Sequence, residues 1–143
     1  MKTCEVQNLS EFHAWVKDQV LPMLQPQTLV LLEGEVGAGK TELVKTLCQL
    51  LGLDDVQSPT FAFHNVYSNK TLNLHHVDLY RLKSEEDLES TGFWDLFENE
   101  NDVILVEWSN MIQKEAWPWG WKKVFIQIEK QSGTSRKIQI DTE

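Results

Sequence analysis

One stretch of the chain, residues 28–51, constrains the fold more than any other. It reads TLVLLEGEVGAGKTELVKTLCQLL, and its residues 34–41 match the P-loop pattern of glycine, four residues, glycine, lysine and serine or threonine. The apolar run before the loop predicts a buried strand at residues 29–32. The spacing after it predicts a helix over residues 40–51, which Gly52 ends. A strand, a glycine-rich loop and a helix in this order form the geometry that a phosphate site requires.

The loop residues suit phosphate chemistry. Gly34, Gly37 and Gly39 allow tight turns that present backbone N–H groups inward, and the following helix N-terminus adds partial positive charge. Lys40 can reach the β- and γ-phosphates, and the Thr41 hydroxyl can bind magnesium. We therefore expect a nucleotide to bind along the whole loop, through Gly34, Glu35, Val36, Gly37, Ala38, Gly39, Lys40 and Thr41.

Length and charge narrow the possible functions. A chain of 143 residues can bury a sizeable core, and we expect one domain spanning residues 1–143. The net charge of −9 argues against a broad surface for DNA or RNA backbones. The two cysteines, Cys4 and Cys48, lack metal-ligand spacing and suit a reducing cytosol. No apolar run approaches membrane-spanning length and the N-terminus has no signal core, so we expect a cytoplasmic protein without a membrane segment.

The remaining patterns predict a mixed sheet. Residues 3–7 read as a short edge strand, and Ser10 as the cap of a helix that runs to about Leu24. Two pairs of alternating segments predict hairpins, one formed by residues 61–67 and 72–80, the other by residues 124–129 and 135–140. The expected class is therefore α/β, a three-layer P-loop NTPase-like fold whose mixed central sheet contains antiparallel hairpins.

Two acids are candidates for the magnesium side of the site. Residues 103–107, VILVE, form a β-prone apolar run that ends in Glu107, which is the Walker B arrangement. Asp78 ends another apolar-rich strand and is a candidate acid near magnesium or water. Trp108, at the end of a strand, is a candidate for a role beyond core filling. Zinc binding by His75, His76 and Asp78 is a weaker alternative, because neighbouring strand residues face opposite ways.

Three further features each keep more than one interpretation. Thr60, in the segment SPT, could sense the γ-phosphate or its magnesium, or belong to a plain turn before a strand. Arg81 could pair with Asp78, contact phosphate or form a surface salt bridge. The tryptophans at positions 117, 119 and 121 could form a binding face, although packing on the core is favoured by the large apolar area of such rings.

Four segments, GEVGAGKT, SPTF, HVDLYRL and VEW, follow one another in an order that resembles the TsaE family, formerly YjeE. This family comprises small P-loop ATPases required for threonylcarbamoyladenosine formation on tRNA. The resemblance is close over about residues 10–108 and looser in the C-terminal hairpin. It implies ATP and Mg²⁺ as cofactors. It also implies catalytic roles for Lys40, Asp78 and Glu107, magnesium binding by Thr41 and Glu107, and nucleotide contacts from Thr60 and Trp108.

The resemblance further implies a partner-dependent ATPase. Family members act with TsaD and TsaB, reach tRNA position 37 only through that complex, and reset it between rounds by hydrolysing ATP. We would expect weak turnover alone, from a monomer or weak oligomer. Glu35 and Val36 stand where the family often has Asp-Leu. This difference leaves the expected phosphate site in place, because neither side chain need touch phosphate. Two alternatives stay open: a small-molecule kinase, for which the two arginines provide few lid residues, and a nucleotide-sensing adaptor that does not hydrolyse ATP.

Overall fold

The computed structural model describes residues 1–35, 37–56, 64–79, 84–108 and 112–143. The strands are β1 (Lys2–Val6), β2 (Thr28–Glu33), β3 (Asp54–Val56), β4 (His64–Ser68), β5 (Asn73–Asp78), β6 (Val103–Glu107), β7 (Lys122–Lys130) and β8 (Arg136–Thr142). The helices are α1 (Leu9–Trp15), α2 (Lys40–Leu51) and α3 (Glu85–Glu89), with a π-helical turn at Val16–Val20 and 3₁₀ turns at Leu21–Met23, Phe93–Glu98 and Lys114–Ala116. Within these ranges, no helix combines the length and the apolar character that crossing a membrane requires.

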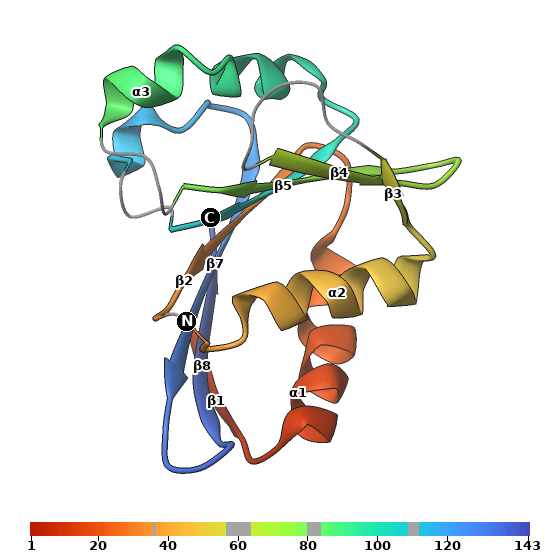
Figure 1. Ribbon diagram of the computed structural model, residues 1–143, viewed down its shortest axis with the longest axis vertical. Helices are drawn as coiled ribbons and strands as arrows, with labels where there is room; N and C mark the ends of the chain where they lie inside the picture. The colour runs from red at the N-terminus through yellow and green to blue at the C-terminus, as the bar shows by residue number, and fades with distance from the viewer. Residues whose placement is uncertain (36, 57–63, 80–83, 109–111) are drawn as a thin grey trace.

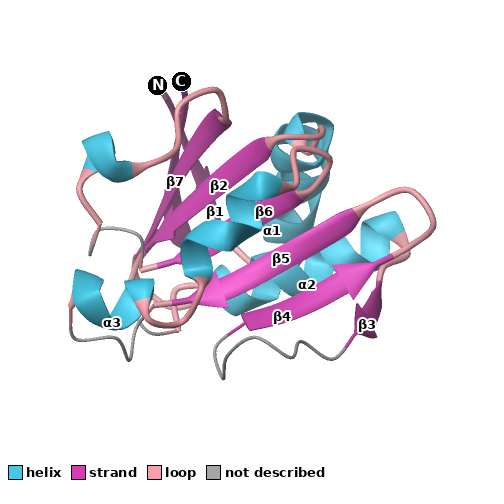
Figure 2. Cartoon of the chain, turned by 90° about the horizontal axis from the view of Figure 1, so that it is seen from above, coloured by secondary structure: helices cyan, strands magenta, loops and turns pink. Residues whose placement is uncertain are grey.

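The described strands form one mixed sheet with the order β1-β8-β7-β2-β6-β5-β4-β3. β2 pairs in parallel with β6 and β7, and β6 pairs in parallel with β5. The other pairs are antiparallel, including the hairpins β4–β5 and β7–β8. Figure 2 shows the two outer groups of strands on either side of the parallel centre. The prediction of a mixed sheet with antiparallel hairpins is confirmed.

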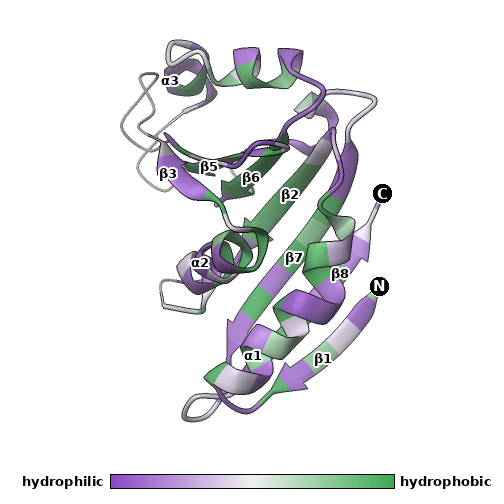
Figure 3. Ribbon diagram, turned by 90° about the vertical axis from the view of Figure 1, so that its right-hand side faces the viewer, coloured by the Kyte–Doolittle hydropathy of each residue, from purple (hydrophilic) through white to green (hydrophobic). Residues whose placement is uncertain are grey.

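Helices cover both faces of the sheet, which makes three layers (Figure 1). On one face, Val30 and Leu32 of β2 belong to a core that includes Leu43 and Leu47 of α2. On the other face, Leu29 and Leu31 belong to a second core that contains several aromatic rings, those of Phe93, Phe97, Trp117 and Trp121 among them. β2 is hydrophobic along nearly its whole length because it is covered on both sides, whereas β7 alternates (Figure 3).

The N-terminal helix is shorter and differently capped than the sequence predicted. Asn8, and not Ser10, is the N-cap, since its backbone is extended and its Oδ1 accepts a hydrogen bond from the Glu11 N–H at 2.9 Å. Ser10 already lies inside the first turn of α1. Regular α-helix ends at Trp15, and π-helical and 3₁₀ turns continue towards Leu24, so the predicted single helix was wrong in its second half. The expected edge strand is confirmed as β1.

The two hairpins were predicted from local patterns, but their neighbours in the sheet were not. Residues 61–63 and 80 of the first predicted hairpin lie outside the described residues. Asp54 and Asp55 lie in β3, and both are exposed. The second hairpin lies beside the P-loop strand, because β7 pairs in parallel with β2 from Thr28 to Glu33. This placement brings the hairpin β7–β8 against the candidate site.

Candidate functional site

The P-loop joins β2 to α2 and passes close to β7. A Cβ atom at Gly34 would lie 2.5 Å from the carbonyl oxygen of Ile128, which is closer than real Cβ contacts allow. Only glycine therefore fits at this point without a shift of the backbone. Gly39 is the N-cap of α2, with a positive φ of 127° that glycine tolerates, and Leu43 N–H donates to its carbonyl at 2.9 Å. The N-terminus of α2, with its partial positive charge, is thus formed directly at the loop.

Lys40, the first residue of α2, is 5% exposed and lies among groups of opposite charge. Its Nζ donates to the carbonyl of Gly34 and, at 3.3 Å, to that of Glu35. The same atom lies 3.9 Å from the centroid of the Trp108 ring. Burial lowers the pKa of Lys40 below its usual 10.5, while the carboxylates of Glu107, Asp78 and Glu35 oppose that shift. The backbone oxygens of Gly34 and Glu35, the Trp108 ring and the nearby carboxylates therefore hold the ammonium group in one position.

Parallel strand pairing brings the two candidate acids together. Asp78, at the end of β5, lies opposite Glu107, at the end of β6, and Glu107 lies opposite Leu32 of β2. Because the carboxyl ends of parallel strands meet at one edge of a sheet, both acids reach the edge where the P-loop begins. Glu107 is 4% exposed, and its Oε2 lies 2.5 Å from Nε2 of His76. The sequence placed His76 and Asp78 on one strand face, but it carried no signal that His76 would bind Glu107.

Trp108 has an uncommon backbone conformation. Its φ is 63°, in the left-handed region that bulky residues seldom adopt, and its N–H donates to the Leu32 carbonyl at 3.0 Å. This turn at the end of β6 places the indole ring over the Lys40 ammonium group. Strained conformations of this kind are retained where the surroundings hold them, and they gather at functional sites.

A cavity of about 490 Å³ lies between these groups, in the size range of small-molecule sites. Its lining residues are Gly37, Gly39, Lys40, Thr41, Glu42, Lys45, Asp78, Glu107 and Trp108. The structure thus brings together the candidate catalytic and magnesium residues. Val36, Thr60 and Arg81 lie outside the described residues. Sequence reasoning missed Glu42 and Lys45, although Lys45 follows Thr41 by four positions, which is the spacing of one helix face.

The oxygen donors at this cavity fit a magnesium ion. Thr41, Asp78 and Glu107, whose side chains carry hydroxyl or carboxylate oxygens, all line it, and Mg²⁺ prefers a few such ligands together with phosphate oxygens and water. The zinc alternative does not match the arrangement. His75 contacts His64 and Asp102, whereas His76 contacts Glu107, so the histidines bind different partners in different places.

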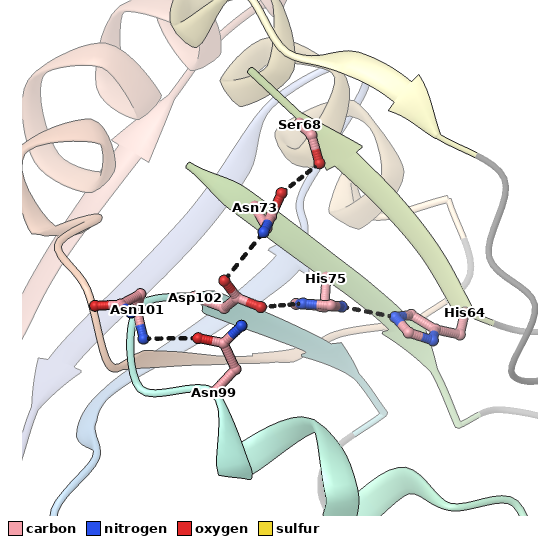
Figure 4. Close-up of polar contacts among 7 residues, drawn as sticks. All are labelled: His64, Ser68, Asn73, His75, Asn99, Asn101 and Asp102. Carbon is pink, nitrogen blue, oxygen red and sulfur yellow. Dashed lines mark hydrogen bonds and ion pairs between the residues drawn. The ribbon is translucent and has the colours of Figure 1, made fainter. Parts of the chain in front are cut away.

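A second polar network lies apart from the cavity, between β4, β5 and the start of β6 (Figure 4). A hydrogen bond of 2.9 Å joins Nε2 of His64 to Nδ1 of His75, and Nε2 of His75 lies 2.6 Å from Oδ2 of Asp102. Asn73 donates to the other oxygen of Asp102 at 3.3 Å. Burial, and then the neighbouring His75 and His76, lower the pKa of His64 from 6.5 to about 4. This network ties three strands together with buried polar groups.

The tryptophan cluster divides into two environments. Trp117 and Trp121 are 6% and 4% exposed and pack with Phe97 in the second core. Trp119, between them, is 98% exposed. The preference for packing is confirmed for the outer two rings and wrong for the central one.

Comparison with known proteins links this geometry to one family. A family model described as "Threonylcarbamoyl adenosine biosynthesis protein TsaE" matches residues 6–138. A tRNA threonylcarbamoyladenosine biosynthesis protein TsaE from Rickettsia typhi is 38% identical over 95 residues, covering 63% of this chain and 62% of the relative. The protein of the same name from Bacillus subtilis is 37% identical over 92 residues, covering 64% and 56%. The alignments thus span less than two thirds of these relatives' length.

A solved structure has the same fold over nearly the whole chain. The crystal structure of YdiB from Bacillus subtilis superposes with a TM-score of 0.72 at 28% sequence identity. The superposition covers 99% of this chain and 84% of that one.

Proposed function

Because this chain belongs to the TsaE family of threonylcarbamoyl adenosine biosynthesis proteins, we propose that it binds and hydrolyses ATP as an accessory in threonylcarbamoyladenosine modification of tRNA. One observation carries the proposal: a single cavity is lined by the P-loop, by Lys40 and Thr41 at the start of α2, and by Asp78 and Glu107 at two strand ends. These are the groups that phosphoryl transfer to water requires.

Binding begins with the loop and the helix N-terminus. The backbone N–H groups of Gly37, Gly39, Lys40 and Thr41 and the positive end of α2 form an anion site for the nucleotide phosphates. Lys40 exchanges its two backbone carbonyl partners for phosphate oxygens, which carry more negative charge and make stronger hydrogen bonds. Trp108 covers the Lys40 ammonium and keeps bulk water from it.

Thr41 and Glu107 would hold the magnesium ion, which supplies neutralising charge at the phosphates when bound. An acid must also orient the attacking water by accepting its hydrogen bond, and Asp78 and Glu107 both lie at the cavity. His76 fixes the carboxylate of Glu107 from the buried side, so that this acid keeps one orientation. Charge stabilisation by positioned groups is the main source of rate enhancement in such sites.

The proposed partners are the TsaD and TsaB proteins, with tRNA reached only through their complex. The net charge of −9 supports this indirect route, because direct binding of a tRNA backbone relies on clustered positive charge. We propose a cytoplasmic setting and a monomer or weak oligomer in the absence of the partners. ATP hydrolysis would then reset the TsaB–TsaD complex between rounds.

The test is phosphate release from ATP and Mg²⁺ by the purified chain, with and without the TsaB–TsaD pair. Stimulation by the pair, lost in Lys40→Ala and in Glu107→Gln, is the expected result. We expect a drop of at least roughly a hundredfold, because each change removes charge stabilisation of the transition state. Lys17→Ala, at an exposed lysine on the N-terminal helical segment, is the matched control.

The outcomes separate the proposal from its alternatives. Binding of ATP without multiple turnovers, even with the pair, would favour a nucleotide-sensing adaptor. Transfer of labelled phosphate to a metabolite in place of water would favour a kinase. Equal turnover by Lys40→Ala and the unchanged protein would refute the site itself.

A further inference from the structure

Arg136, the first residue of β8, binds the P-loop from the side of its carbonyl groups. Its Nε donates to the carbonyl of Ala38 at 2.8 Å, and one terminal nitrogen donates to the carbonyl of Gly37 at 3.4 Å. The other terminal nitrogen donates to the carbonyl of Ser135 at 2.9 Å, which holds the guanidinium against its own strand. The side chain thus connects the C-terminal hairpin to a loop 98 positions earlier in the chain.

These contacts bear on how the loop presents its N–H groups. A P-loop binds phosphate only if successive N–H groups point into the cavity, and the carbonyls of the same peptide units then point away from it. Outward carbonyls need partners of their own when they are shielded from water. The guanidinium has donors in a rigid plane, which suits two neighbouring carbonyls better than a flexible ammonium does. Its positive charge also favours the orientation of peptide dipoles that a phosphate site needs.

Two further contacts show that the hairpin β7–β8 supports the loop from behind. The carbonyl oxygen of Ile128 lies 2.5 Å from the position of a Cβ at Gly34, and Nζ of Lys130 lies 2.9 Å from the position of a Cβ at Gly37. Arg136 points to this side because it shares a strand face with the buried Ile138 and Ile140. Lys137, the next residue, lies on the opposite face of β8.

We propose that Arg136 is a positioning residue for nucleotide binding, which holds the Ala38–Gly39 peptide unit with the Gly39 N–H ready for phosphate. Its bond to the Gly37 carbonyl holds the neighbouring peptide unit, whose Ala38 N–H donates to the Glu35 carbonyl at 3.0 Å and closes the turn of the loop. The inference rests on the proposed nucleotide-binding function. Arg136 belongs to a distant hairpin and contacts the loop, but it does not line the cavity of about 490 Å³. The expected cost of removing it falls on phosphate affinity more than on the stability of the fold.

The test compares Arg136→Met, which keeps an apolar stem without donors, with Arg136→Lys and with the control Lys137→Met. Affinity is measured for ATP with Mg²⁺ and for adenosine, which has no phosphate. Loss of one or two charge-assisted hydrogen bonds predicts roughly tenfold weaker ATP binding by Arg136→Met, with adenosine binding unchanged. Arg136→Lys keeps the charge and should lose about threefold, while Lys137→Met should match the unchanged protein.

Hydrogen exchange of the loop amides in the nucleotide-free protein gives a second readout. Arg136→Met should speed exchange of the Ala38 amide, whose N–H donates to the Glu35 carbonyl, and leave the amides of β6 unchanged. Equal ATP affinity and equal exchange in Arg136→Met and the unchanged protein would overturn the inference. If that variant does not fold, an unchanged ATP affinity in Arg136→Lys would overturn it. If the unchanged protein binds no ATP, the proposed function fails, and the exchange rates alone decide the role of Arg136.

Discussion

Acidification should destabilise this protein through His64, and the size of the effect follows from the buried network in Figure 4. His64 is 4% exposed, and its pKa is lowered from 6.5 to about 4. Burial is the larger cause, and the positive charge that His75 and His76 can carry adds to it. Because the pKa of His64 is lower in the folded protein than in the unfolded chain, a falling pH protonates this group in the unfolded chain first. Protonation then favours the unfolded chain over the folded protein. Stability is therefore lost as the pH falls from about 6.5 to about 4.

The magnitude comes from proton linkage. With pKa values of 6.5 in the unfolded chain and about 4 in the folded protein, His64 costs about 2 kcal/mol between pH 7.5 and pH 5. Most of that loss falls within the window between the two pKa values. Other groups titrate over the same range, so the contribution of His64 must be isolated by a variant that cannot take up the proton. His64→Gln keeps a side chain able to hydrogen bond to His75 but has no titration.

The assay is urea unfolding of both proteins at the two pH values. We expect the free energy of unfolding of the original protein to fall by about 2 kcal/mol more than that of His64→Gln. At pH 7.5 the variant should be slightly less stable, because its amide replaces a well-packed ring. Equal losses in the two proteins, within about 0.5 kcal/mol, would refute the assignment of a depressed pKa to His64.

Two pairs of substitutions, one at glycines and one at tryptophans, test the packing described above. Gly34→Ala should lower the free energy of unfolding by about 2 kcal/mol or more and weaken ATP binding, because its Cβ meets the backbone of β7. Gly52 has a φ of 64° and open space around it, so Gly52→Ala should cost about 1 kcal/mol and leave ATP binding unchanged. Thermal unfolding and ATP titration check both, and equal effects would contradict the clash. Trp121→Ala should cost about 3–5 kcal/mol of unfolding free energy, whereas the exposed Trp119 should tolerate alanine within about 0.5 kcal/mol. Similar losses at the two tryptophans would contradict their assigned environments.

Elements with a continuous local signal were predicted nearly to the residue. α2 spans Lys40–Leu51 and ends at Gly52 as expected, and β6 spans Val103–Glu107. Ser84 caps α3 by accepting a hydrogen bond from the Asp87 N–H at 3.2 Å. Within α2, Leu50 is 40% exposed and does not join the core. The single-domain assignment stays a prediction.

The sequence by itself determined the P-loop, the strands that lead to Asp78 and Glu107, and the mixed character of the sheet. These features depend on contiguous residues, since loop turns, strand alternation and helix faces are properties of short segments. The family resemblance came from four such segments, and the family model confirms it.

Only the tertiary structure decided which segments became neighbours. The contact between His76 and Glu107 spans 31 positions, and that between Arg136 and Ala38 spans 98. Both depend on the order of strands in the sheet, which places β5 beside β6 and β7 beside β2. That order follows from burying two apolar faces at once, a condition on the whole chain that no local pattern encodes.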